Sequence, residues 1–117
     1  MILRRMLGLS GVALTNAAYN PLGTRPGDTP THRTDIQNFI DALFTNAMTD
    51  IDGNGVSTSA ITDGVLLLRA LSGYGGSAVT AAAISGSPPA TRQTWGAIYD
   101  YLSGTCGITT LAPRSTP

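Results

Sequence analysis

The sequence predicts a mainly α-helical fold built from two helical repeat units of about 60 residues each. Apolar residues recur at helical spacing, a stretch from the N-terminal end returns in the second half, and Gly or Pro clusters separate the apolar stretches. The 117-residue length fits one domain. A hydrophobic content of 42% with only 12% charged residues excludes a disordered chain.

The repeat is visible when residues 2–19 are laid without a gap over the segment that begins at Leu67. Eight identical residues then coincide: Leu3, Arg4, Gly8, Gly11, Ala13, Thr15, Ala17 and Ala18 meet Leu68, Arg69, Gly73, Gly76, Ala78, Thr80, Ala82 and Ala83. After a linker that is longer in the first copy, the match resumes with Arg33, Ile36, Phe39, Asp41 and Leu43 on Arg92, Trp95, Ile98, Asp100 and Leu102. Such units bury their apolar faces on one another.

This alignment predicts a first unit over residues 1–49, a second over 50–112, and a short tail over 113–117. Met1 aligns with Leu66, inside a helix of the second unit, so the first unit lacks the loop that precedes that helix. Met1 is then either an internal methionine of a longer chain or the start of a protein that lost its first loop. We expect the tail, which contains two prolines, to fray or to act as a linker.

Two helices open the second unit. The spacing of Val65, Leu66, Leu68 and Leu71 predicts a helix that stops at Gly73, because glycine readily adopts the left-handed conformation that ends helices. A short alanine-rich helix is expected over Ser77 to Ile84.

The last helix of each unit carries an apolar stripe. Over about Thr91 to Leu102 the stripe consists of Trp95, Ile98, Tyr99 and Leu102, and in the first unit of Ile36, Phe39, Ile40 and Leu43. Thr34 and Gln37 have the spacing of a capping box. We expect these stripes to form the core and not a cofactor or sugar site.

Oxygen-bearing side chains alternate immediately before the second unit's first helix. Asp50, Asp52 and Asn54 are followed by Gly55, which matches positions 1, 3, 5 and 6 of a calcium loop. Calcium takes six to eight hard oxygen ligands, and alternate side chains of a tight loop can face one ion. Val56 would add its backbone carbonyl, and Thr58 stands at the ninth position.

The acid that closes such a loop is displaced. The twelfth position holds Ile61, and the nearest acid is Asp63, at the mouth of the following helix. There a carboxylate can close the metal site or cap the helix. Taken alone, Asp50 to Gly55 could also be an ordinary Asn-Gly turn. The alternating oxygens ahead of a helix that opens with an acid favour calcium.

Residues 50–84 resemble the dockerin-type, EF-hand-like calcium repeat of bacterial secreted and surface proteins, and residues 1–20 resemble a copy without its loop. The resemblance implies that Ca²⁺ folds the loop onto its helix through the side chains of Asp50, Asp52, Asn54 and Asp63 and the carbonyl of Val56. Dockerins also bind a cohesin partner through polar positions that would fall near Ser59 and Ala60. Here the second loop of a dockerin is absent.

Several function classes are disfavoured. Seven Arg balance seven Asp, so no net charge favours nucleic acid, and no apolar run approaches the roughly 20 residues of a membrane span. His32, which we place in a surface linker, is the only histidine and Cys106 the only cysteine, so we expect no enzyme. Cys106 is either a buried apolar residue or the partner of a cysteine in another chain.

The composition indicates an extracellular or cell-surface protein that assembles. The chain contains neither Lys nor Glu, and Ser, Thr, Asn and Gln desolvate more cheaply than charged side chains. We therefore expect a calcium-stabilised, non-catalytic structural subunit that forms an oligomer or filament through its repeat faces. The alternative is a dockerin-like interaction module of a larger secreted protein. We expect the first helix to meet a neighbouring chain or an upstream segment, unless Trp95 and Ile98 cover it.

Overall fold

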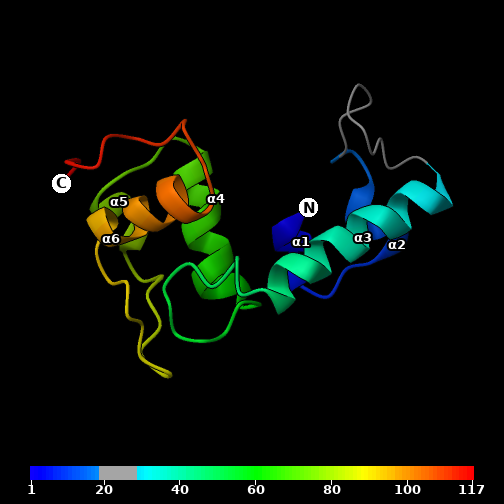
Figure 1. The fold of residues 1–117 in the computed structure, drawn as a ribbon, viewed down its shortest axis with the longest axis horizontal. Coiled ribbons are helices and arrows are strands. Elements are labelled where there is room, and N and C mark those ends of the chain that lie inside the picture. The colour runs from blue at the N-terminus through cyan, green and yellow to red at the C-terminus, as the bar shows by residue number, and fades with distance from the viewer. Residues whose placement is uncertain (19–28) are drawn as a thin grey trace.

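The computed structural model describes residues 1–18 and 29–117, and over these ranges the chain is mainly helical and contains no strand. Helices α1 to α3 lie side by side with α4 to α6 and the C-terminal segment, as Figure 1 shows. The linker predicted after the first copy falls largely on residues 19–28, outside the described residues. The helices are α1 (Ile2–Met6), α2 (Gly11–Thr15), α3 (Pro30–Thr45), α4 (Val65–Leu71), α5 (Ser77–Thr80) and α6 (Trp95–Asp100), with π-helical turns η1 (Ala60–Gly64) and η2 (Tyr101–Thr105).

Each group of helices has its own apolar core. The smaller core joins α2 to α3 through Leu14, Ile36 and Ile40, with Met1 and Ile2 packed against it. The larger core joins α4, α5 and α6, and its buried members are Ile51, Leu66, Ala70, Val79, Ala83, Trp95, Ile98 and Leu102. Ile51 belongs to the acidic loop, so the loop is packed into the second core.

The turns α1–α2 and α4–α5 share one local design. In both, an arginine of the first helix donates two hydrogen bonds to carbonyls at the end of the second helix. The bonds run from Arg4 to Leu14 (3.3 Å) and Asn16 (2.5 Å), and from Arg69 to Val79 (2.9 Å) and Ala81 (2.7 Å). The backbone agrees as well, because Ala17 and Ala82 both have a φ of 55°. The sequence identity in these two stretches therefore accompanies the same side-chain contacts.

Two repeat units of 60 residues are not shown. Helix α3 has 16 residues, whereas α6 has six and continues into η2. Ile98 is completely buried, but Phe39, its partner in the alignment, is 53% exposed. The shared geometry is clearest in the helical turns at the start of each predicted unit.

Several local predictions are wrong. Helix α5 ends at Thr80, whereas the sequence predicted a helix as far as Ile84. Helix α3 begins earlier than expected, with Thr29 as its N-cap, so Thr34 is an interior residue whose hydroxyl bonds Pro30 and no capping box forms. His32 is consequently in the first turn of a helix and not in a linker. Helix α6 starts at Trp95 and not at about Thr91, because Thr94 caps it by accepting a hydrogen bond from Ala97 N at 3.3 Å.

Helix α1 is covered only in part from inside the chain, and none of its residues is fully buried. Met1 and Ile2 pack against the smaller core, and the ion pair of Arg5 with Asp41 (2.7 Å) ties α1 to α3. Trp95 and Ile98 do not contribute, because they belong to the other core. None of the helices in the described residues is long and apolar enough to cross a membrane.

The C-terminal segment is bound to the second group of helices and is not frayed. The Trp95 indole donates to the Pro113 carbonyl at 2.9 Å, and Arg114 pairs with Asp100 at 2.8 Å. Ser77 N donates to the Pro117 carbonyl at 3.3 Å. The segment therefore lies along α5 and α6 as part of the fold.

Candidate metal centre

Asp50 organises the acidic loop by accepting hydrogen bonds from its backbone. Its Oδ1 accepts from Asn54 N and its Oδ2 from Gly55 N, both at 3.0 Å. Gly53 and Gly55 have φ values of 71° and 86°, in the left-handed region that L side chains rarely adopt. Two glycines at these places allow the loop to turn sharply, so that its acidic side chains point to the same side.

The loop brings three carboxylates together. Asp50, Asp52 and Asp63 each offer one oxygen within 4.8 Å of the others. All three are buried, with exposed fractions of 8%, 0% and 0%. Two full negative charges at this distance repel by on the order of 3 kcal/mol at an effective dielectric constant of 20. Such a cluster is stable when a proton or a cation neutralises part of its charge.

Asp63 faces the loop and not its own helix. It lies in the π-helical turn η1, and its Oδ1 accepts hydrogen bonds from Ile51 N (2.6 Å) and Asp52 N (3.2 Å). Ile61, at the usual position of the closing acid, is 78% exposed. The i to i+5 turn, closed by the bond from Gly64 N to the Ser59 carbonyl (3.0 Å), is wider than an α-helical turn. The structure thus brings the displaced acid, not residue 61, to the carboxylate cluster.

The chemistry of Asp63 differs from that of a surface carboxylate. Burial is the main cause that raises its pKa to about 7, and the charges of Asp52 and Asp50 raise it further. The hydrogen bonds from Asp52 N and Ile51 N act in the opposite direction. Its Oδ2 atom is buried and has no hydrogen-bond partner among the described residues. An unpaired carboxylate oxygen beside two other buried carboxylates is suited to a cation.

The other two predicted ligands are less deeply placed. Asn54 is half-buried, and its Oδ1 accepts a hydrogen bond from Val56 N at 2.8 Å. Val56 is 38% exposed and follows directly on the turn. An amide oxygen can accept a hydrogen bond and still ligate a metal through its second lone pair. The three acids therefore form the buried cluster, and Asn54 and Val56 are more exposed than these acids.

Residues 85–92, which are distant in the sequence, donate hydrogen bonds to the acidic loop. The sequence analysis did not predict these contacts. Ser85 N donates to Asp52 Oδ2 at 2.8 Å, and the Thr91 hydroxyl donates to the Gly53 carbonyl at 2.9 Å. Arg92 adds a hydrogen bond from its backbone N to the Asp52 carbonyl at 2.8 Å, besides those of its side chain. These residues follow the loop by 33 or more positions. No local spacing in the sequence could have indicated them.

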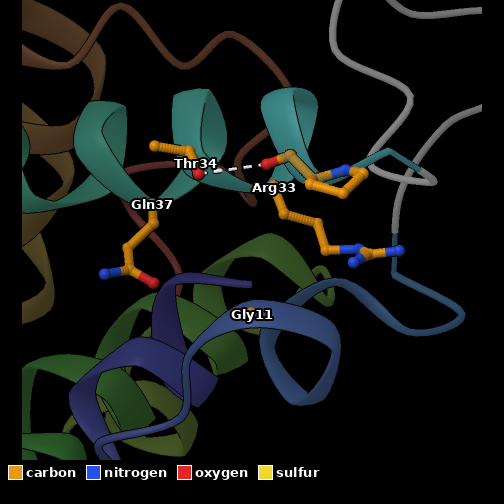
Figure 2. A pocket seen from close by; sticks show the side chains of 5 residues that line it. Gly11, Arg33, Thr34 and Gln37 are labelled. Atoms are coloured by element: carbon orange, nitrogen blue, oxygen red, sulfur yellow. Dashed lines mark hydrogen bonds between the residues drawn. The ribbon is translucent and has the colours of Figure 1, made fainter.

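A separate pocket lies between α2 and the start of α3, away from the acidic cluster. It has a volume of about 250 Å³ and is lined by Gly11, Pro30, Arg33, Thr34 and Gln37. Figure 2 shows Arg33 and Gln37 extending from α3 on the side of α2, while the Thr34 hydroxyl is bonded within its own helix. None of these five residues carries a carboxylate, a thiol or an imidazole.

No protein-family model, no curated protein and no solved structure matches this chain.

Proposed function

We propose that the chain binds one Ca²⁺ ion through Asp50, Asp52 and Asp63, with the Asn54 side chain and the Val56 carbonyl completing the site. The observation that carries this proposal is the buried Asp63 carboxylate, whose Oδ2 lacks a hydrogen-bond partner among the described residues. A buried carboxylate with an unsatisfied oxygen is costly, and a bound cation removes that cost.

The donor set favours calcium over other common metals. The three ligands of the cluster are all carboxylates. Zinc and copper sites usually contain imidazole or thiolate ligands, so the cluster does not suit these metals. Calcium accepts irregular sets of six to eight oxygens, whereas magnesium demands near-octahedral geometry and retains water. A loop that combines carboxylates, an amide and a carbonyl fits calcium better.

Calorimetric titration of the purified chain tests this proposal. We expect one calcium ion per chain, weaker binding of magnesium, and no binding by a variant that combines Asp50→Ala with Asp52→Ala. An absence of heat with calcium in the wild-type chain, or equal binding by the double variant, would contradict the proposal.

We further propose that the calcium is structural and that the chain is not an enzyme. The loop is followed directly by η1 and α4, so an ion held by Asp63 would anchor that helix to the loop. Burial raises the pKa of the Cys106 thiol, and this lowers its reactivity as a nucleophile. His32 lies on α3, which belongs to the smaller core, whereas Cys106 packs against the larger core.

For such a unit we propose a role in self-assembly, outside the cell or at its surface. An apolar groove of about 200 Å³ runs between α1 and α4, lined by Met1, Ile2, Leu3, Gly64, Leu67, Leu68 and Leu71. Leu68 and Leu71, which line this groove, are 52% and 55% exposed. Exposed apolar side chains beside a groove favour contact with protein. Calcium sites in extracellular modules also tolerate weak affinity, because calcium is abundant there.

The alternative is a dockerin-like module that recognises a different protein. Light scattering over a wide range of protein concentration, with calcium present, distinguishes the two roles. Particle mass that grows with concentration supports self-assembly, and a monomer at every concentration supports the module.

A further inference from the structure

Arg92 makes the most extensive contact between the acidic loop and the rest of the chain. Its guanidinium donates from Nε to the Ile51 carbonyl at 2.8 Å and from Nη2 to the Asp50 carbonyl. The same guanidinium lies over the ring of Tyr101, with its Cζ atom 4.0 Å from the ring centroid. The planar fork is thus held on one side by an aromatic ring while it binds two consecutive carbonyls.

The two peptide groups that Arg92 binds are those that bind Asp63. The first joins Asp50 to Ile51: its carbonyl accepts from Arg92, and its N–H donates to Asp63 Oδ1 at 2.6 Å. The second joins Ile51 to Asp52: its carbonyl accepts from Arg92 at 2.8 Å, and its N–H donates to Asp63 Oδ1 at 3.2 Å. Two parallel peptide groups therefore stand between a guanidinium and a carboxylate.

This arrangement aligns the peptide dipoles with the charges at both ends. In a trans peptide the carbonyl and the N–H point in opposite directions, so the carbonyl oxygens face the cation and the N–H groups face the anion. Hydrogen bonds in such a chain polarise and strengthen one another. The guanidinium thus favours the orientation in which both N–H groups face Asp63 Oδ1.

We propose that Arg92 is a positioning residue for the metal site: through the peptide groups of Asp50–Ile51 and Ile51–Asp52 it orients Asp63 so that its unpaired oxygen can ligate the cation. This inference rests on the proposed calcium function. Arg92 does not touch the ion in this account. It acts on a ligand through the backbone, as the hydrogen-bond partners of metal ligands commonly do.

Positioning by Arg92 and simple charge repulsion predict opposite changes in calcium affinity when Arg92 is replaced. A positive charge near a cation site repels the cation, so removing the charge of Arg92 should tighten calcium binding if charge alone mattered. If Arg92 positions Asp63, removing its donors should weaken binding, by roughly 10- to 100-fold on the scale of such partner residues.

Calorimetric calcium titrations of the full chain and three variants test the proposal. Arg92→Met removes the charge and every side-chain donor but retains the backbone N–H and an unbranched stem. Arg92→Lys retains the charge but cannot bridge two carbonyls as a fork. Arg114→Met is the matched control, because Arg114 pairs with Asp100 on α6 and has an exposed side chain.

We expect a 10- to 100-fold higher dissociation constant for Arg92→Met, a smaller increase for Arg92→Lys, and a change below twofold for Arg114→Met. The titrations are performed at a temperature where circular dichroism shows each chain to be folded without calcium. A merely structural role would lower the melting temperature of Arg92→Met and leave the dissociation constant of its folded form unchanged.

Equal or tighter calcium binding by folded Arg92→Met would overturn the proposal. If that variant does not fold, Arg92→Lys decides the matter, and wild-type affinity in it overturns the proposal. If the wild-type chain itself takes up no calcium, the proposed function fails and the inference fails with it. If wild type binds and Arg92→Met binds as well, only the positioning role fails.

Discussion

At the residue scale, Asp63 combines properties that conflict in the absence of a cation. It is completely buried, it lies within 4.8 Å of two other carboxylates, and the Oδ2 atom has no hydrogen-bond partner in the described part of the chain. Burial raises its pKa to about 7, so the metal-free folded chain holds a proton there for only part of the time at neutral pH and for most of the time at lower pH. Burial of Asp63 in the folded chain therefore favours its protonated form, whereas metal binding requires its ionised form.

Replacement of Asp63 by asparagine separates the effect of this residue on stability from its effect on metal binding. Asparagine retains one oxygen acceptor for Ile51 N and Asp52 N but carries no charge. We expect Asp63→Asn to lose calcium binding while its melting temperature in chelator equals or exceeds that of wild type. Asp35→Asn, at an exposed position of α3, is the control and should change neither property. A marked drop in the melting temperature of metal-free Asp63→Asn would count against this account.

The raised pKa of Asp63 also predicts the pH dependence of the metal-free chain. An unfolded aspartate titrates near its ordinary value of 3.8, whereas folded Asp63 titrates at about 7. Between these values the native state binds more protons than the unfolded state, so the contribution of Asp63 to stability falls as the pH rises. Denaturant unfolding in chelator at pH 4.5 and at pH 8 measures this loss as the difference between wild type and Asp63→Asn. A difference that stays constant over this range would show that Asp63 titrates normally.

At the element scale, one arginine-to-carbonyl design occurs at two helical turns. Arg4 holds the end of α2 and Arg69 holds the end of α5, each through two backbone carbonyls. The four-residue α5 and the five-residue α2 are too short to be stable by themselves. Their conformation depends on these hydrogen bonds and on the burial of Leu14 and Val79.

Substitution of either arginine should therefore destabilise its turn. We expect Arg4→Met and Arg69→Met each to lower the free energy of unfolding by about 1 to 3 kcal/mol, because hydrogen bonds from a charged donor are lost and partly buried carbonyls remain. Arg114→Met, which breaks an exposed ion pair, should have a clearly smaller effect on the free energy of unfolding. Urea unfolding curves measure the three values. Equal effects at all three positions would argue against a special role of the two turns.

At the scale of the whole molecule, the acidic loop connects the two cores. It follows α3 of the smaller core, contributes Ile51 to the larger core, and leads through η1 into α4. The chain extends over 42 × 29 × 21 Å, with its helices in two adjoining groups (Figure 1). An ion in this loop would therefore stabilise the junction as well as the site.

Calcium should accordingly raise the thermal stability of the entire chain. A ligand that binds only the folded state contributes about 2.7 kcal/mol when its free concentration is 100 times the dissociation constant. For a chain of this size that corresponds to a rise in melting temperature of roughly 10 °C. Scanning calorimetry at several free calcium concentrations measures the shift, with magnesium as the control. Superimposable curves in excess calcium and in excess chelator would contradict a structural role for the ion.

What the sequence determined by itself is local. Apolar spacing, Gly73 and the identical residues of the repeat predicted α4 and the shared turns correctly, since these features depend on neighbours in the chain. The alternation of Asp50, Asp52 and Asn54 indicated the loop for the same reason. The cap of α3 was predicted wrongly, although Pro30 directly after Thr29 is itself a local signal of a helix start.

Only the tertiary structure decided how the acids become a buried cluster. The π-helical turn brings Asp63 to the cluster although it stands two positions beyond the usual closing acid. The Arg92 guanidinium reaches the loop from 42 residues away along the chain. The physical reason is that burial and hydrogen bonding between distant segments depend on how the second core packs. Spacing along the chain carries no information on which distant donor meets a given carbonyl.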